Sequence, residues 1–185
     1  MNSVYHDRSQ PSLQLIFQGC GGLYNYMLGV AKRIQMKYEL PKNTIYTGVS
    51  GGNLPMILLA TGMDIEDAWQ NFNLPLLQKV NEYKTGALFN WNSECRQAAL
   101  DYFPDDIHTR INHKCHVSIS EVNYQSYQEE GLFSNDLISH WNSKEDVVDC
   151  IKASGFIPLL DTQLSSSYRN NWYVDGAMSD GEPQV

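Results

Sequence analysis

The stretch TIYTGVSGGNLPMILLAT, residues 44–61, decides how the rest of the chain is interpreted. It opens with a short run rich in β-branched and aromatic residues, which favours a strand. It closes with an apolar run of helical length that stops at Gly62. Between the two runs a serine stands among glycines, in the order Gly48, Val49, Ser50, Gly51, Gly52. We therefore predict a strand over 44–49, a tight turn and a helix over 53–61.

The same strand–turn–helix pattern occurs nearer the N-terminus, in the stretch LQLIFQGCGGLYNYMLGV. Residues 13–19 predict a mostly buried strand that ends in a glycine-rich turn. Apolar residues at roughly helical spacing then predict a helix over 23–38, with Pro41 as its stop signal. Two strand–turn–helix units in succession are typical of an α/β protein with a mainly parallel sheet.

The remaining elements have weaker signals. Alternating apolar and polar residues favour a strand over 114–122, and a last short strand is expected over 171–177. Residues 124–133 fit either a hairpin arm or a loop. Four helices are expected: 63–72 capped by Asp64 or Thr61, 92–103 capped by Asn92 or Ser93, 134–141, and 143–154 capped by Ser143.

The composition is that of one globular domain, with 185 residues of which 42% are hydrophobic and 18% charged. We expect a polar lead-in over 1–12 and a single domain over 13–185. The net charge of −8 and the lack of a Lys/Arg cluster argue against a nucleic-acid partner. The four cysteines are scattered, and neither a secretory h-region nor a membrane-spanning run occurs, so we expect a soluble, cytoplasmic protein with free thiols. Transient contact with a lipid surface stays compatible with these features.

Ser50 is a candidate nucleophile because of its position in the chain. A serine at a sharp strand-to-helix turn projects its hydroxyl out of the fold, and flanking glycines avoid clashes there. The following helix supplies free backbone N–H groups and a partial positive charge, which stabilise a developing oxyanion. The alternative is an ordinary glycine turn with an incidental serine, because the Gly-x-Ser-x-Gly pattern also recurs by chance.

The glycine loop after the first strand consists of Gly19, Cys20, Gly21 and Gly22. A dinucleotide fingerprint would need a further glycine where the chain has Tyr24, and a phosphate loop ending in Gly-Lys-Ser/Thr is absent, so we expect no cofactor. Consecutive glycines let backbone N–H groups point at one spot, and we interpret the loop as a candidate oxyanion hole to which Cys20 contributes its backbone. A glycine turn without a ligand is the alternative.

A nucleophilic serine needs a base, and the histidines supply no evident one. The order Ser, Asp/Glu, His is typical of α/β-hydrolases, and here His140 is the last histidine. To act as the base, it would have to pair with an aspartate between 51 and 139, and no sequence motif supports such a pair. The cluster His113-Lys-Cys-His116 lacks a second ligand pair, so we expect no metal site.

Asp175 is a further candidate, whose functional interpretation depends on Ser50 needing a base. It follows the last predicted strand and precedes Gly176 and Ala177. Asp-Gly is a common turn pair, so a purely structural role is the alternative.

Four segments together resemble the patatin-like phospholipase family. They are IFQGCGGLYNYMLGVAKRI (16–34), GVSGGN (48–53), IKASGFIPLL (151–160) and YVDGAMSDGEP (173–183). The family pattern is a glycine-rich oxyanion loop, a Gly-x-Ser-x-Gly elbow, an Ala-Ser-x-x-x-Pro block and an Asp-Gly-Gly/Ala turn. All four occur here in that order, over a region that runs from about residue 13 to the end. The chain departs from the family at Tyr24, where the first loop usually has another glycine.

The resemblance implies a three-layer α/β/α patatin-like fold with a mainly parallel central sheet. It implies a Ser–Asp dyad without histidine, in which Ser50 attacks an ester carbonyl and Asp175 accepts the proton. The Gly19–Gly22 loop would hold the oxyanion, and water would release a fatty acid from an acyl-serine. Family substrates are phospholipid, galactolipid or acylglycerol esters, and some members transfer acyl chains. Relatives commonly continue beyond the Asp-Gly turn, so we expect a domain that is short at its C-terminal end.

Two alternatives to a lipid acyl hydrolase remain at this point. One is a degenerate fold that binds a lipid or a protein partner, and the other is a serine hydrolase with a histidine base such as His140. The apolar segment 74–91, with interleaved aromatic residues, fits a lid, a wall of an acyl groove or plain core packing, of which core packing is the simplest interpretation.

Overall fold

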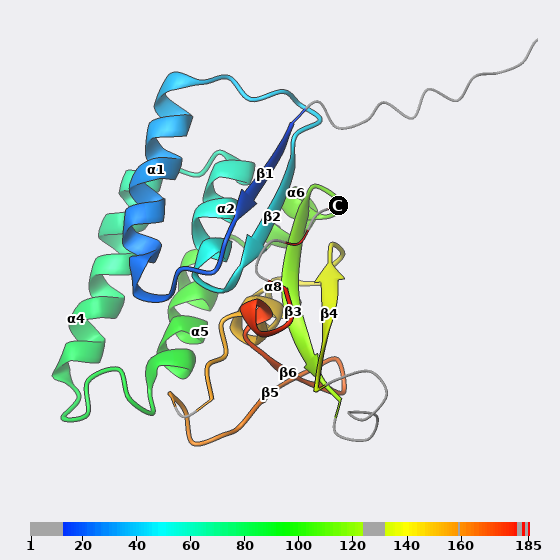
Figure 1. The fold of residues 1–185 in the computed structure, drawn as a ribbon. Coiled ribbons are helices and arrows are strands. Elements are labelled where there is room, and N and C mark those ends of the chain that lie inside the picture. Colours follow the sequence, from blue (N-terminus) through cyan, green and yellow to red (C-terminus); the bar gives the residue numbers. More distant parts are fainter. Residues whose placement is uncertain (1–12, 124–131, 159, 181–182, 184) are drawn as a thin grey trace, which may run out of the picture.

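The computed structural model describes residues 13–123, 132–158, 160–180, 183 and 185. The predicted α/β class is confirmed, since a central sheet is flanked by helices (Figure 1). The expected lead-in over 1–12 and most of segment 124–133 lie outside the described residues.

Within the described residues the sheet has six strands in the order β1-β2-β3-β6-β5, with β4 on the other edge of β3. Strands β1, β2 and β3 are parallel, β4 and β6 run antiparallel to β3, and β5 runs antiparallel to β6. Most of the strands therefore point in one direction. The strands are β1 (Gln14–Phe17), β2 (Ile45–Val49), β3 (Cys115–Val122), β4 (Phe133–Ile138), β5 (Ser166–Tyr168) and β6 (Asn171–Val174).

The helices follow the strand–turn–helix rhythm in the first half of the chain. The α-helices are α1 (Tyr24–Lys37), α2 (Asn53–Thr61), α3 (Ile65–Ala68), α4 (Leu74–Glu82), α5 (Trp91–Tyr102), α6 (Ile107–Ile111) and α8 (Lys144–Ser154). A π-helical turn, Trp69–Asn73, links α3 to α4. Three 3₁₀ turns follow the ends of β1, β2 and β6, namely Gly21–Leu23, Ser50–Gly52 and Gly176–Met178.

Local capping explains several of the helix ends. The Ser143 hydroxyl accepts a hydrogen bond from the Asp146 N–H and begins α8, and the Asp64 carboxylate accepts one from the Glu66 N–H and begins α3. Helix α2 ends at Gly62, whose φ of 71° is the left-handed conformation that glycine adopts at low cost. The predicted caps Ser143 and Asp64 are thereby confirmed.

Two predictions were wrong. Residues 134–141 form no helix: 133–138 are strand β4, which pairs with β3 from Val117 to Val122. The long antiparallel ladder supplies a tertiary partner that outweighs local helical preference. Helix α5 begins after Asn90, not after Asn92 or Ser93, and no side chain caps it.

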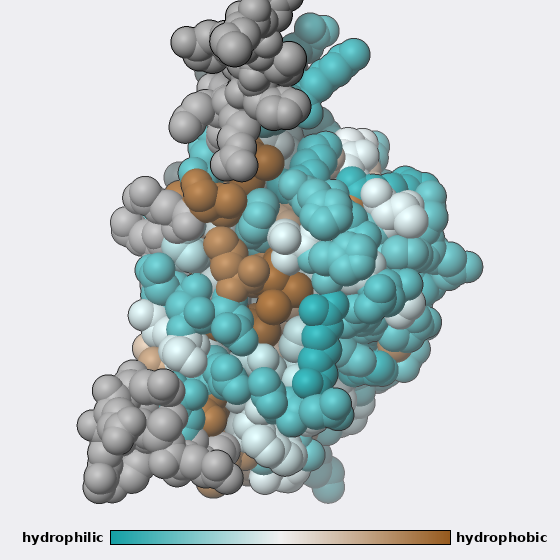
Figure 2. Space-filling model, turned by 90° about the vertical axis from the view of Figure 1, so that its right-hand side faces the viewer, coloured by the Kyte–Doolittle hydropathy of each residue, from teal (hydrophilic) through white to brown (hydrophobic). Residues whose placement is uncertain are grey.

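The core lies between the sheet and the helices. One face of the sheet contributes Tyr46, Val117 and Ile119 to it, and α2 is buried along nearly its whole length. Figure 1 shows α1, α4 and α5 on one side of the sheet, away from β4. The side toward β4, seen in Figure 2, has an apolar patch surrounded by hydrophilic residues.

The register around β3 determines where the site forms. Strand β2 ends where Val49 pairs with Ser118, and β6 ends where Val174 pairs with Ser120. Strand β4 pairs with both Ser118 and Ser120, so β2 and β6 must share the opposite edge of β3. They approach from opposite directions and end facing each other. The residue that follows each strand is therefore placed in the gap between them.

Candidate active site

Ser50 follows β2 directly and occupies a sharp elbow. Its φ of 51° is unusual for a residue with a side chain, as expected for a serine held on a strained strand-to-helix turn. A side chain at Gly52 would meet the Phe17 carbonyl oxygen at 2.2 Å, so the close approach of β1 requires glycine there. Val49, before the serine, is fully buried. The predicted elbow Gly48–Gly52 thus exists as a structural element.

Two buried side chains hold the elbow in its strained conformation. The Ser50 N–H donates to the Ser154 hydroxyl oxygen at 2.9 Å, and Ser154 donates in turn to the Ser118 carbonyl at 2.6 Å. The Asn53 amide donates to the Ser50 carbonyl at 2.9 Å and to the Ser154 hydroxyl at 2.8 Å. Ser154 belongs to the Ala-Ser-x-x-x-Pro block, and the sequence alone predicts no role for it. Its position between the elbow and β3 supplies that role.

Asp175 follows β6 and faces Ser50. The Ser50 hydroxyl donates to Asp175 Oδ2 at 2.5 Å, and the Ala177 N–H donates to Oδ1 at 2.9 Å. Asp175 is 7% exposed, and burial raises the pKa of its carboxyl group above the ordinary value, against the lowering effect of these two hydrogen bonds. A carboxylate of raised basicity that accepts a serine hydroxyl proton is the geometry a general base requires.

The turn after Asp175 is fixed against β3. A side chain at Gly176 would meet the Ser118 carbonyl oxygen at 2.2 Å, so no larger residue fits this approach. The Ser120 hydroxyl donates to the Asp175 carbonyl at 2.8 Å and accepts from the Ser179 N–H at 3.0 Å. These contacts keep the carboxyl group in register with the elbow.

The glycine loop lies against both functional residues. A Cβ added to Gly19 would be 3.5 Å from the Ser50 Cβ and 3.2 Å from the Ala177 Cβ. A Cβ added to Gly51 would be 3.1 Å from the Gly21 carbonyl oxygen. The loop, the serine elbow and the Asp-Gly-Ala turn are therefore in direct contact, as the predicted site requires.

The loop also faces the cavity that holds the serine. Gly21 and Gly22 line this cavity together with Ser50, and they begin a 3₁₀ turn whose first N–H groups have no partner within the turn. Burial and the nearby charge of Asp175 raise the pKa of the Cys20 thiol. Cys20 is thus held as a neutral thiol, and this environment does not activate it as a nucleophile.

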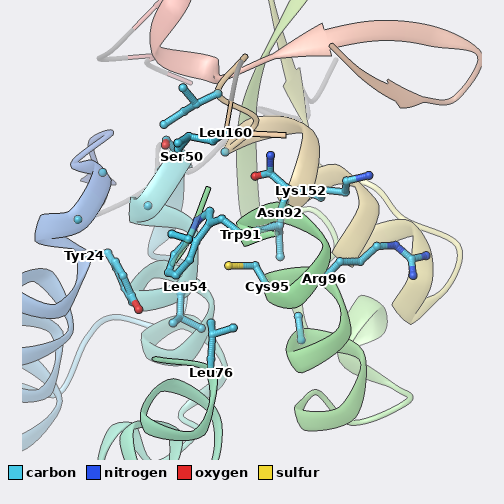
Figure 3. A pocket seen from close by; sticks show the side chains of 18 of the residues that line it. Tyr24, Ser50, Leu54, Leu76, Trp91, Asn92, Cys95, Arg96, Lys152 and Leu160 are labelled. Atoms are coloured by element: carbon cyan, nitrogen blue, oxygen red, sulfur yellow. The ribbon is translucent and has the colours of Figure 1, made fainter. Parts of the chain in front are cut away.

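A cavity of about 410 Å³ opens beside Ser50. This volume is in the range of small-molecule sites. Its lining is mainly apolar and comes from α2, the π-helical turn, α4, α5 and α8, with Leu54, Phe72, Leu76, Trp91, Phe103 and Ile151 among its residues. Figure 3 shows Ser50 at one end of this space and Leu76 at the other. Segment 74–91 accordingly supplies a wall of the cavity through Leu76 and Trp91, while Leu76 and Val80 also pack into the core.

One wall of the cavity is polar. Asn92, Arg96 and Lys152 line it on the side formed by α5 and α8 (Figure 3). Asn92 is 4% exposed, and its Nδ2 has no hydrogen-bond partner among the described residues. Arg96 Nε donates to Asp149 Oδ1 at 2.6 Å, which joins α5 to α8. The sequence does not predict this wall, because its residues come from two helices far apart in the chain.

None of the described histidines lines the cavity. His140 stacks on His113 with 5.2 Å between ring centroids, and both residues lie near the amino end of β3. Ser50 lies at the carboxyl end of β2, the opposite edge of the parallel sheet. His140 therefore does not serve as the base of Ser50 in this structure.

These observations define an α/β protein with a serine on a strained elbow, a carboxyl group in hydrogen-bond contact with it and an apolar cavity beside both. The model of the Patatin-like phospholipase family matches residues 15–184. The chain belongs to this family, which confirms the resemblance seen in its sequence.

Relatives with curated names agree with this placement. The chain is 30% identical to the 1-acylglycerol-3-phosphate O-acyltransferase Pnpla3 of Mus musculus, over 91% of this chain and 40% of that protein. It is 30% identical to Patatin-like phospholipase domain-containing protein 2 of Homo sapiens, over 90% of this chain and 32% of that protein. With the Omega-hydroxyceramide transacylase of Mus musculus it shares 25% identity, over 90% of this chain and 27% of that protein. The chain thus spans about a third of the length of these relatives.

Across the described residues, no helix is both long and apolar enough to cross a membrane.

Proposed function

We propose that the protein is a lipid acyl hydrolase that cleaves carboxylic esters through a Ser50–Asp175 dyad. The observation that carries the proposal is the 2.5 Å hydrogen bond from the Ser50 hydroxyl to the Asp175 carboxylate, beside an apolar cavity. The apolar lining suits an acyl chain, and membership of the Patatin-like phospholipase family supports an ester of a lipid as the substrate. Phospholipids and acylglycerols are the candidate classes.

In the proposed first step the Ser50 oxygen attacks the ester carbonyl carbon, and Asp175 takes the hydroxyl proton. The carbonyl oxygen becomes an oxyanion that backbone N–H groups of the Gly19–Gly22 loop stabilise. When the ester C–O bond breaks, Asp175 returns the proton to the leaving alkoxide, and the acyl group remains on Ser50. In the second step water attacks this acyl-serine, Asp175 takes the proton of the water, and the fatty acid leaves as Ser50 recovers its proton.

The second step can deliver the acyl group either to water or to an alcohol. Two of the relatives are named as an acyltransferase and a transacylase, so an alcohol in place of water is the competing outcome for the second step. We propose hydrolysis because water needs no dedicated site, whereas an alcohol acceptor does.

The rim of the site favours transient contact with a lipid surface. Leu23, after the glycine loop, is 69% exposed, Met178, after the Asp-Gly-Ala turn, is 53% exposed, and Ile157, in the cavity lining, is 40% exposed. Exposed large apolar side chains around a lipid-binding site lower the cost of meeting a membrane or micelle. The double variant Leu23→Gln/Met178→Gln should bind vesicles more weakly and keep its activity on a dissolved short-chain ester.

The direct test is active-site labelling followed by product analysis. A fluorophosphonate probe should label the wild type at Ser50 and fail to label Ser50→Ala. A panel of phospholipids and acylglycerols should then give free fatty acid, measured by mass spectrometry, with the wild type alone. Folded protein without labelling would favour the alternative of a lipid- or protein-binding module, and transfer of the acyl group to an added alcohol without release of fatty acid would favour an acyltransferase.

A further inference from the structure

Tyr24 is the first residue of α1 and contacts both the glycine loop and the serine elbow. Its backbone N–H donates to the Gly21 carbonyl oxygen. A Cβ added to Gly51 would lie 3.2 Å from the Tyr24 Cβ, so the tyrosine packs closely against the residue that follows Ser50. In a serine elbow, the N–H of this following residue is a common donor to the oxyanion. Tyr24 therefore lies between the two segments that would hold the oxyanion.

The phenol group of Tyr24 is anchored on a buried amide. Its hydroxyl donates to Asn73 Oδ1 at 2.5 Å, and Asn73 Nδ2 donates in turn to Asn25 Oδ1 at 2.7 Å. Asn73 is fully buried and ends the π-helical turn, so a single amide holds the first two residues of α1. Burial raises the pKa of Tyr24, which keeps its hydroxyl protonated and able to donate. Figure 3 shows the hydroxyl directed away from Ser50, so it is not itself a donor to the oxyanion.

Two glycines of the loop are not wedged in place by neighbouring atoms. Among the described residues, a Cβ added to Gly21 or Gly22 would meet nothing within 4 Å, in contrast to Gly52, which the backbone of β1 encloses. Both are exposed, and a glycine also leaves the φ of 50° found at Gly21 at low cost. Backbone donors stabilise an oxyanion well only when they are already held in position. Leu23 is 69% exposed, so Tyr24, at 8% exposed, is the first buried side chain after the loop that can hold it.

We propose that Tyr24, through its hydrogen bond to Asn73, positions the backbone N–H groups of the glycine loop for the oxyanion. The inference rests on the proposed function and adds a positioning residue to the same site. Without this hydrogen bond the start of α1 can shift relative to the π-helical turn, and the loop attached to it shifts as well. A displaced donor hardly changes the binding of the intact ester, but it no longer matches the oxyanion. The loss should therefore appear in kcat and leave KM nearly unchanged.

A pair of ligands measures oxyanion binding without turnover, namely octyl trifluoromethyl ketone and the alcohol obtained by reducing it. The Ser50 oxygen adds to the ketone carbon, Asp175 takes the serine proton, and the ketone oxygen becomes an oxyanion. The alcohol has no carbonyl group and forms no adduct. We expect the wild type to bind the ketone at least about a hundredfold more tightly than the alcohol, measured by isothermal titration calorimetry. In Tyr24→Phe this preference should fall about tenfold, while binding of the alcohol should stay within about twofold.

Tyr102→Phe is the matched control. It also removes a phenol hydroxyl that donates to a side chain, here Asp67 Oδ2 at 2.8 Å, but Tyr102 does not line the cavity beside Ser50. This variant should keep the ketone preference even if its melting temperature falls as much as that of Tyr24→Phe.

A double variant tests whether Tyr24 acts through Asn73. Asn73→Ala should reduce the ketone preference about as much as Tyr24→Phe does. The double variant Tyr24→Phe/Asn73→Ala should lose no more than Asn73→Ala alone, because both changes remove the same hydrogen bond. Tyr24→Phe tests the proposal alone if Asn73→Ala does not fold.

The outcomes distinguish this inference from the proposed function. A ketone preference that Tyr24→Phe retains overturns the inference and leaves the dyad standing. An equal loss of ketone and alcohol binding means that Tyr24 only shapes the cavity, and it overturns the inference too. So does an equal loss of the preference in Tyr24→Phe and Tyr102→Phe, since that loss would follow from lower stability. No ketone preference in the wild type, or an undiminished preference in Ser50→Ala, contradicts the proposed function itself.

Discussion

Val49 and Val174 are the last residues of two strands that end facing each other along the same edge of β3. Each is followed by a residue of the candidate dyad, and a hydrogen bond of 2.5 Å joins Ser50 and Asp175, which are 125 positions apart in the sequence. The position of both groups is thus set by backbone ladders rather than by flexible loops. Groups held in this way need little reorganisation at the moment of reaction.

Replacing either member of the dyad should remove activity without unfolding the protein. Ser50→Ala and Asp175→Asn should each lower kcat for a lipid ester by about 10⁴- to 10⁶-fold, as loss of the nucleophile or of one of its triad partners does in other serine hydrolases. Asp175→Asn keeps an oxygen that accepts from the Ala177 N–H and removes a desolvated charge. Circular dichroism at pH 7 should therefore give a melting temperature equal to or above that of the wild type. Substantial activity in Asp175→Asn would exclude the dyad.

The raised pKa of Asp175 predicts how activity depends on pH. The proposed base acts as a carboxylate, so kcat/KM should rise with pH and level off above the raised pKa, with its midpoint above the value of about 3.9 for an ordinary aspartate. The contribution of Asp175 to the free energy of unfolding changes with pH in the opposite direction. The native state binds this proton more tightly than the unfolded state does, so protonation removes the buried charge and stabilises the native state as pH falls. The stability advantage of Asp175→Asn should shrink accordingly toward acid pH.

A pH–rate profile on a dissolved ester, with melting curves at the same pH values, measures both effects. His140→Gln is the matched control, because His140 lies at the other edge of the sheet and its loss should leave the acidic limb in place. An acidic limb that disappears in His140→Gln would assign the base to a histidine instead.

Local signals in the sequence were sufficient to single out Ser50 and Asp175 as candidates, and the resemblance to the family joined them as a dyad. Ser50 and Asp175 each stand at the end of a strand, beside glycines that a close backbone approach requires. The strand–turn–helix repeat likewise predicted β1, α1, β2 and α2 within a few residues, since hydrophobic periodicity and glycine turns are properties of short windows.

What could not be predicted depends on contacts between distant segments. Strand β4 is a strand because β3 offers it a ladder, and its own residues contain no clear period-two pattern. Ser154 supports the elbow across 104 positions, and the Arg96–Asp149 pair joins α5 to α8 across 53 positions. No spacing rule in a single sequence reports such pairs.

Ser154→Ala should weaken the elbow that presents Ser50. It leaves the Ser50 N–H and the Asn53 amide without their shared acceptor, and the loss of buried hydrogen-bond partners costs about 1–3 kcal/mol. Because the φ of 51° at Ser50 is then less firmly held, kcat should fall about ten- to a hundredfold with little change in KM. Denaturant melts and steady-state kinetics measure the two effects. Ser93→Ala, at an exposed position on α5, is the control and should change neither stability nor kcat. An unchanged kcat in Ser154→Ala would show that Ser154 does not position Ser50.

Ala99→Leu should shorten the acyl chain that the cavity accepts. Ala99 lies on α5 and is buried in the wall of the cavity. It is seven residues, or about 10 Å along the helix, beyond Asn92 in the direction of Phe103. The added atoms fill space that only a long chain reaches, so kcat/KM for a palmitoyl ester should fall about tenfold or more while that for a butyryl ester stays within about twofold. Ala98→Leu places the same atoms on the same helix outside this cavity and should leave the ratio of the two esters unchanged. An equal loss on both esters in Ala99→Leu would mean that the acyl chain lies elsewhere.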